Sequence, residues 1–227
     1  MPKNFERTTD AVLGLTCIVV LSLLLRREFS QPKSVTVSTE PTEFIENWHD
    51  LLPSGIRDGS PTAKLVVVEF GDLECPACKV FNESFANLRK KYGQEVALVF
   101  VHYPLSIHRF APLAARALEC AHEQGRGGSM ITAVYGKQDS SGLKSWDGFA
   151  NEAGVPNATE LQSCVVSSRV FPRIRSGIEF GNRLGVRGTP TILINGWRVR
   201  PGNTFAQAMD AVRDGRAPYE KFNRRSF

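Results

Sequence analysis

The sequence predicts an α/β domain that carries an inserted helical subdomain and follows an N-terminal membrane segment. A β-branched, apolar run at 64–70 leads into a Cys-x-x-Cys pair that opens a helix. A Gly-Thr-Pro-Thr segment at 188–191 precedes a second β-run. Between these segments, residues 105–185 exceed a simple crossover connection and contain several helical patterns, so we expect them to form the insertion.

The membrane segment is predicted from a charge-free run at 11–25. Such a run is either the core of a signal peptide or a short membrane anchor. No small-x-small cleavage site follows it, and Arg26-Arg27-Glu28 comes directly after it. We therefore expect an uncleaved signal anchor over 1–28. Basic residues flank the run on both sides, so the positive-inside rule leaves its orientation open.

Residues 29–57 are predicted to connect this anchor to the domain. Their first part, 30–41, is rich in Ser, Thr and Pro, which is typical of an exposed tether. The following stretch, 42–52, has apolar residues at helical spacing and Thr42 in position to cap them, which predicts a short amphipathic helix. We expect this helix to pack against the domain.

The domain itself occupies 58–227 and begins with a turn at 58–61. Its predicted strands are 64–70, 96–102, 191–194 and 197–200, the last two joined by an Asn-Gly hairpin signal. Its predicted helices are 76–91, 112–123, 129–134, 146–153, 159–166, 169–184 and 204–213. Five of these seven helices fall within or at the end of the insertion. The glycine-rich stretch 125–129 is expected to weaken the start of the helix that follows it.

Composition is that of an ordinary globular protein. Hydrophobic residues make up 42% of the chain and charged residues 22%, which is enough for a substantial core. The net charge of +5 is mild, and the basic residues form neither one long run nor an aromatic-basic motif. These features argue against nucleic-acid binding.

The cysteine pair is placed for redox chemistry. Pro76 suits the first turn of a helix, where its missing N–H is not needed, so Cys75 lies at the helix N-terminus. Free amides and the helix dipole stabilise a thiolate there, and Cys78 lies one turn deeper on the same side. A zinc half-site and an inert buried pair are the alternatives. Zinc would need two further ligands at short spacing, and the other cysteines and the histidines are scattered singly along the chain.

Glu69 interrupts the apolar strand just before the cysteine pair. One interpretation is an edge-strand position that faces water. The other is a buried acid beneath the active site, whose raised pKa lets it hold or pass a proton when Cys78 is attacked or released. The sequence leaves both open.

Two motifs resemble those of the DsbA-like thioredoxin family, the extracytoplasmic thiol–disulfide oxidoreductases. Val68–Cys78 fits Val-Glu-Phe-x-Asp-x-x-Cys-Pro-x-Cys, and Leu184–Thr191 fits Leu-Gly-Val-x-Gly-Thr-Pro-Thr. The segments 102–105 and 114–121 are also similar, and the resemblance spans about 58–213. It implies a thioredoxin fold.

The resemblance also implies roles for individual residues. Cys75 becomes the nucleophile, Cys78 the resolving thiol and Glu69 the buried acid. Thr189 and Pro190 form the cis-proline pair, with Pro190 in the active site. Substrate would lie against three residues: Thr189, Pro76 and Ala77. Ala77 departs from strongly oxidising members, which carry histidine there, so the dipeptide between the cysteines offers no imidazolium to the thiolate.

The expected function is thiol–disulfide exchange between the Cys75–Cys78 pair and cysteines of exported proteins, on the extracytoplasmic side of a membrane. A membrane or periplasmic redox protein would recycle the pair. No metal, nucleotide, flavin or nucleic acid is expected, and the chain is expected to be a membrane-tethered monomer. The alternatives are a reductase or isomerase of the same fold, or a thioredoxin-fold binding or holdase module without redox turnover.

Other chemistry-bearing residues lie in or beside the insertion. Cys120 and Cys164 fall on different predicted helices, where they form either a second, structural disulfide or two buried thiols. His102 and Tyr103 end a strand and could reach the active-site face, although a lone histidine is more often structural.

Overall fold

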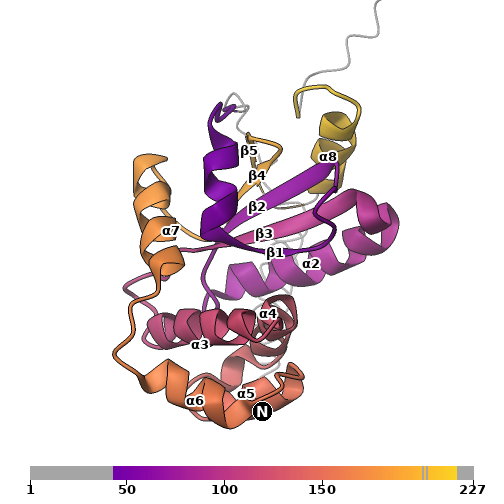
Figure 1. Ribbon diagram of the computed structural model, residues 1–227. Helices are drawn as coiled ribbons and strands as arrows, with labels where there is room; N and C mark the ends of the chain where they lie inside the picture. The colour runs from indigo at the N-terminus through magenta and orange to yellow at the C-terminus, as the bar shows by residue number, and fades with distance from the viewer. Residues whose placement is uncertain (1–42, 201, 203, 219–227) are drawn as a thin grey trace, which may run out of the picture. The chain divides into compact units, whose positions relative to one another are not determined.

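Strand β2 (Leu65–Gly71) lies at the centre of a five-stranded sheet (Figure 1). The computed structural model describes residues 43–200, 202 and 204–218. The strand order is β1-β3-β2-β4-β5, where the other members are β1 (Gly55–Asp58), β3 (Val96–His102), β4 (Thr191–Ile194) and β5 (Trp197–Val199). Strands β2 and β3 are parallel, and the remaining neighbours are antiparallel. This mixed sheet confirms the predicted α/β class.

Both faces of the sheet are buried, which explains the uninterrupted apolar run of β2. On one face Leu65 and Val67 share a core with α2 (Pro76–Tyr92) and α8 (Phe205–Arg213). On the other face Val66 and Val68 pack with the 3-10 helix η1 (Trp48–Ser54), and α7 (Pro172–Arg183) lies against the same side. A further 3-10 turn, η2 (Gly93–Glu95), links α2 to β3.

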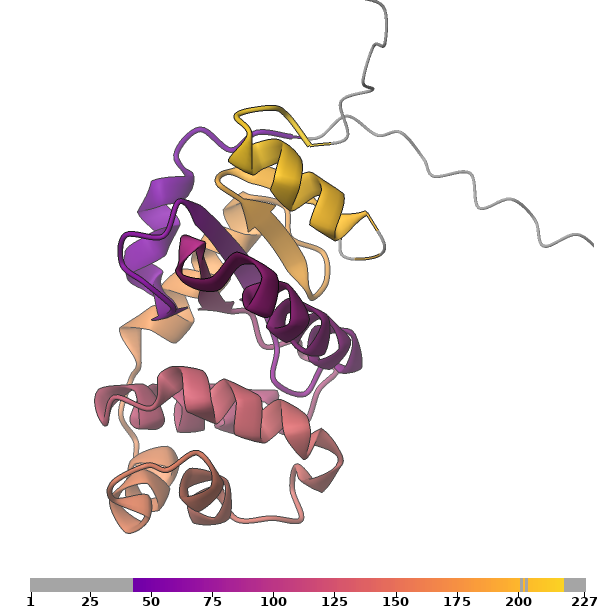
Figure 2. The ribbon, with the colours of Figure 1, turned by 90° about the vertical axis from the view of Figure 1, so that its right-hand side faces the viewer.

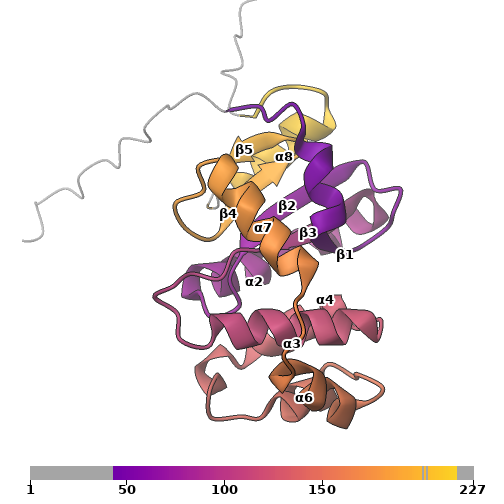
Figure 3. The ribbon, with the colours of Figure 1, turned by 60° about the vertical axis from the view of Figure 1, so that its left-hand side comes forward.

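The predicted helical insertion is confirmed. It contains α3 (Ala111–Glu123), α4 (Gly127–Gly136), the short η3 (Gln138–Ser140), α5 (Trp146–Glu152) and α6 (Ala158–Val166). These helices form a separate layer below the sheet in Figures 1 and 2, and α7 returns from that layer to the sheet, as Figure 3 shows. The core of the layer includes both Cys75 and Cys78, so the cysteine pair lies where the insertion meets the sheet.

The segment before the domain differs from the prediction. The amphipathic helix expected at 42–52 is instead the 3-10 helix η1, and Phe44 forms a β-bridge with Trp197. The two rings lie 4.9 Å apart, and Ile45 N–H donates to the Gly196 carbonyl at 2.9 Å. Pairing with the sheet edge therefore replaces the first helical turns. The sequence reasoning also missed β1, which pairs with β3.

The glycines at the start of α4 serve close packing. A Cβ on Gly127 would lie 2.7 Å from the Ile56 side chain, and one on Gly128 would lie 2.7 Å from the Asp58 carboxyl group. The helix begins at Gly127 despite the weak propensity of this stretch, because glycine allows it to approach β1. The stretch that was expected to weaken the helix is thus an interface between the insertion and the sheet.

The predicted signal anchor and most of the tether lie outside the described residues. Within the described part of the chain, no helix has both the length and the apolar character needed to cross a membrane.

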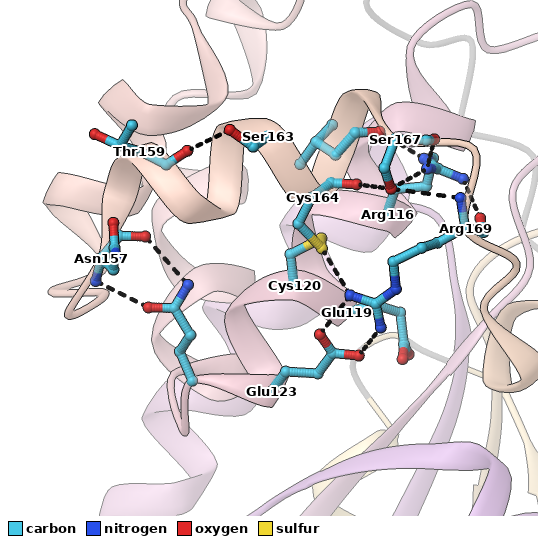
Figure 4. The surroundings of a disulfide bond; sticks show 12 residues. Arg116, Glu119, Cys120, Glu123, Asn157, Thr159, Ser163, Cys164, Ser167 and Arg169 are labelled. Atoms are coloured by element: carbon cyan, nitrogen blue, oxygen red, sulfur yellow. Dashed lines mark hydrogen bonds and ion pairs between the residues drawn. A yellow bond between two sulfur atoms is a disulfide. The ribbon is translucent and has the colours of Figure 1, made fainter.

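Cys120 on α3 and Cys164 on α6 form a disulfide, with their Cα atoms 6.1 Å apart. Figure 4 shows Arg169 beside this bond: its guanidinium approaches the Cys164 sulfur at 3.5 Å and forms an ion pair with Glu123. Arg116 donates to three carbonyl groups just beyond, those of Val165, Ser167 and Arg169. The structure therefore selects the disulfide over the two buried thiols that the sequence left open.

Removing this disulfide should destabilise the insertion. The bond closes a loop with a sequence separation of 44 residues. We expect the double variant Cys120→Ala/Cys164→Ala to lose about 2–4 kcal/mol of unfolding free energy, the usual effect of such a crosslink. Urea unfolding of the oxidised proteins measures the loss, and the two single variants serve as controls for leaving one thiol behind. An unfolding free energy equal to that of the wild type would contradict a structural role.

Candidate active site

The Cys-x-x-Cys segment begins α2 directly after β2. Cys75 is the N-cap residue of the helix, its N–H donates to the Asp72 carbonyl at 3.0 Å, and Pro76 occupies the first turn. The predicted position of Cys75 at a helix N-terminus is confirmed. Cys75 is 6% exposed and Cys78 is 0% exposed, so Cys75 is more enclosed than expected but still the more accessible of the two. Pro76 and Ala77 are exposed beside it.

A cis peptide bond joins Thr189 and Pro190, at the start of β4 and next to Cys75. The Cys75 sulfur lies 3.3 Å from the Thr189 carbonyl oxygen, to which Cys75 donates a hydrogen bond when it is protonated. Both Thr189 and Pro190 are half-buried. The two motifs, separated by more than 100 residues in sequence, therefore meet at one sulfur atom.

The two thiols differ strongly in acidity. The pKa of Cys75 is lowered to about 5, chiefly because Cys78 donates a hydrogen bond to its sulfur. Burial opposes this effect, whereas the amides of Ala77 and Cys78 add to it. Burial, followed by the hydrogen bond to Cys75 and the charge of Glu69, raises the pKa of Cys78. Cys75 is thus the thiolate of the pair and Cys78 the protonated thiol.

Glu69 lies in the central strand β2, opposite Phe100 on β3 and Ile192 on β4. It points to the face covered by α2 and is 0% exposed, so the edge-strand interpretation is wrong. Burial raises its pKa to about 8, and the Cys78 thiol partly offsets this effect. That thiol falls short of full hydrogen-bond geometry, and both Glu69 oxygens lack a hydrogen-bond partner among the described residues. Glu69 therefore holds a proton at neutral pH.

Several residues that support the cysteine turn were missed by sequence reasoning. Gln138 of the insertion donates to the carbonyls of Leu73 and Cys75, at 2.9 and 3.0 Å. Tyr135 donates to the Asp72 carbonyl at 3.3 Å. No local pattern marks either residue, because each reaches the turn only through the packing of the insertion. Asp72 belongs to the quoted motif but was interpreted simply as part of a turn.

His102 lies on the same face of the sheet as Glu69 and Phe100, and its ring is directed to α3. It is buried and hydrogen-bonded to Glu119 of α3 at 2.9 Å, and Glu119 also forms an ion pair with Arg173 of α7. Burial favours protonation of Glu119, but His102 and Arg173 outweigh it and lower its pKa. Tyr103 donates to Asn182 and to the Val186 carbonyl. His102 thus joins β3 to α3, which agrees with the structural interpretation of this histidine, and Tyr103 joins the end of β3 to α7 and the segment after it.

A family model described as thioredoxin matches residues 52–214. The chain belongs to the thioredoxin family. Among solved structures, a thioredoxin-like oxidoreductase from Silicibacter pomeroyi DSS-3 is 26% identical with a TM-score of 0.61, and the match covers 73% of this chain and 96% of that one. DsbA2 from Pseudomonas aeruginosa is 27% identical with a TM-score of 0.52, covering 69% and 92%. The resemblance of this thioredoxin-family chain to DsbA-like oxidoreductases is confirmed.

Curated relatives of this thioredoxin-family chain are much longer. The Na(+)/H(+) antiporter NhaA 1 of Mycolicibacterium gilvum is 33% identical over 160 residues, which is 70% of this chain but 26% of the antiporter. The chain spans about a quarter of the length of the curated relatives it matches.

Proposed function

We propose that the chain is a thiol–disulfide oxidoreductase that transfers the Cys75–Cys78 disulfide to cysteines of exported proteins. The observation that carries this proposal is the Cys75 sulfur at the Thr189 carbonyl, with an acidic Cys75 above a buried, protonated Glu69. A binding module would need none of these features. The substrate would lie over Pro76, Ala77 and the backbone of Thr189.

In the proposed reaction a substrate thiolate attacks the Cys75 sulfur of the oxidised pair. The bond between Cys75 and Cys78 breaks, and Cys78 takes the electron pair and a proton from the Glu69 carboxyl group. A second substrate thiolate then attacks the substrate sulfur of the mixed disulfide, and Cys75 leaves as a thiolate. The substrate gains a disulfide, and the enzyme pair gains two electrons.

The proposed direction follows from the acidity of Cys75. A thiolate stabilised to a pKa of about 5 favours the reduced form of the pair and makes Cys75 a good leaving group. A redox protein of the membrane or periplasm would then reoxidise the pair. The Cys120–Cys164 disulfide supports an oxidising, extracytoplasmic compartment, because such bonds rarely persist in the cytosol. We retain membrane tethering by residues 1–28 and a monomeric state as parts of the proposal.

Measuring the reduction potential of the Cys75–Cys78 pair tests this function. Glutathione equilibration of the full-length chain should give about −150 to −230 mV, between strong oxidants and thioredoxin. A value at or below about −270 mV would indicate a reductase instead. The oxidised protein should also convert a dithiol peptide to its disulfide in stoichiometric amounts. Peptide binding without any loss of thiols would establish the binding-module alternative.

A further inference from the structure

The loop after β3 is tied to the cysteine turn by one buried carboxylate, that of Asp72, which is 2% exposed. One of its oxygens accepts the Leu105 N–H at 2.8 Å and lies 2.7 Å from Nδ1 of His108. Its other oxygen accepts the Glu74 N–H at 2.8 Å. Since the Asp72 carbonyl also accepts the Cys75 N–H, the same residue fixes both His108 and the reactive cysteine.

This arrangement determines which face of His108 is free. Nδ1 donates to the buried carboxylate, so Nε2 is the remaining nitrogen, and it has no hydrogen-bond partner within the part of the chain described. The side chain is 17% exposed, which leaves it open to water and to a bound substrate. The histidine is therefore held in place at one nitrogen and available at the other.

Three groups of the cysteine turn act electrostatically on His108. They are Asp72, Glu74 and the Cys75 thiolate, which come from the turn between β2 and α2. Burial alone would lower the pKa of His108, but these three groups outweigh it and raise the pKa. The neighbouring Arg109 places its guanidinium over the Phe110 ring, at 5.3 Å from the ring centre. Asp72 holds both groups, His108 through its side-chain carboxylate and Cys75 through its main-chain carbonyl, so the imidazole and the thiol lie on either side of one residue.

We propose that His108, oriented by Asp72, is a positioning residue that supplies a positive charge to the Cys75 thiolate. The inference rests on the proposed oxidoreductase function and deepens it. The dipeptide Pro76-Ala77 has no charge, so a stabilising cation must come from outside the Cys-x-x-Cys motif. His108 lies in the loop that follows β3, about 30 residues after Cys78 in the sequence.

The expected effect is moderate, because hydrogen bonds from Cys78 and the helix amides contribute first to the acidity of Cys75. Asn places its side-chain amide where His has Nδ1, so His108→Asn keeps a donor for Asp72 and removes the charge. It should lower the acid dissociation constant of Cys75 about three- to tenfold, as expected for one partly screened charge. The reduction potential should fall by about 15–30 mV, which is that change converted for a two-electron couple.

Thiolate absorbance of the reduced full-length chain, followed against pH, tests the inference without any turnover. His108→Lys should restore most of the acidity that His108→Asn loses. The control His49→Asn, which removes an exposed histidine of η1, should titrate like the wild type. Equal titrations of His108→Asn and wild type would overturn the inference alone. A wild-type Cys75 with an ordinary thiol pKa would overturn it together with the proposed function.

A second measurement separates charge from structure. Because coupling between two sites is reciprocal, oxidation of the cysteine pair should lower the pKa of His108 by the same factor that the histidine confers on Cys75. NMR titration of the His108 ring protons in the reduced and oxidised chain measures this. Identical His108 titration curves in both states, or equal losses of acidity in the Asn and Lys variants, would show that His108 is merely structural.

Discussion

Replacing Cys75 by alanine should abolish disulfide exchange, whereas replacing Cys78 by alanine should trap mixed disulfides. Cys75 is the acidic and more accessible thiol, so its loss removes the attacking group. We expect a fall in exchange rate on the order of 10³-fold or more, as for other lost nucleophiles. In Cys78→Ala, Cys75 still attacks a substrate disulfide, but no internal thiol remains to release the product.

Non-reducing electrophoresis of the full-length variants after incubation with a disulfide-containing substrate measures both outcomes. Cys75→Ala should give no substrate adduct, and Cys78→Ala should give an adduct that dithiothreitol releases. Limiting iodoacetamide provides an independent control on the reduced wild type. Preferential labelling of Cys78 would show that the roles of the two thiols are reversed.

Much of the fold is predictable from local pattern. The apolar runs of β2 and β3 and the hairpin between β4 and β5 have strong signals, and their observed bounds agree closely with the predicted ones. Strand β1 has no such signal. Its sequence, Gly-Ile-Arg-Asp, is short, and it is extended because it pairs with β3. The 3-10 helix η1 was misassigned for a similar reason, since contacts of Phe44 with β5 override the helical spacing before it.

In the candidate site, too, the sequence identifies some residues, whereas other features depend on how the chain packs. The Cys-x-x-Cys and Thr-Pro motifs identify Cys75, Cys78 and Pro190 in sequence, because the chemistry of these residues is local. The environment of Glu69 depends on strand order, which places β2 between two neighbours and beneath α2. Contacts from Gln138 and His108 depend on how the insertion and the loop after β3 pack against the cysteine turn. Such contacts are tertiary, so no local periodicity of the sequence predicts them.

Glu69 should make the folded protein less stable as the pH rises, because its carboxyl group is buried. Burial raises the pKa of Glu69 from its ordinary value of 4.5 to about 8 in the folded protein. A raised folded-state pKa contributes stability that is fully present below pH 4.5 and is lost as the pH rises through 8. Glu69→Gln removes this titration while keeping the shape of the side chain.

The same change should slow thiol–disulfide exchange near neutral pH about 10²-fold, because Cys78 loses its proton donor.

Urea unfolding of the oxidised proteins tests the stability effect, since oxidation removes the Cys75 charge. Between pH 5 and pH 8, wild-type stability should fall by about 3 kcal/mol relative to Glu69→Gln, as the shift in pKa implies. Glu83→Gln, which neutralises an exposed glutamate on α2, controls for the loss of one carboxylate and should follow the wild type. A difference between wild type and Glu69→Gln that does not change with pH would mean that Glu69 ionises normally. In that case Glu69 would hold no proton at neutral pH, and the proposed mechanism would lose the group that protonates Cys78.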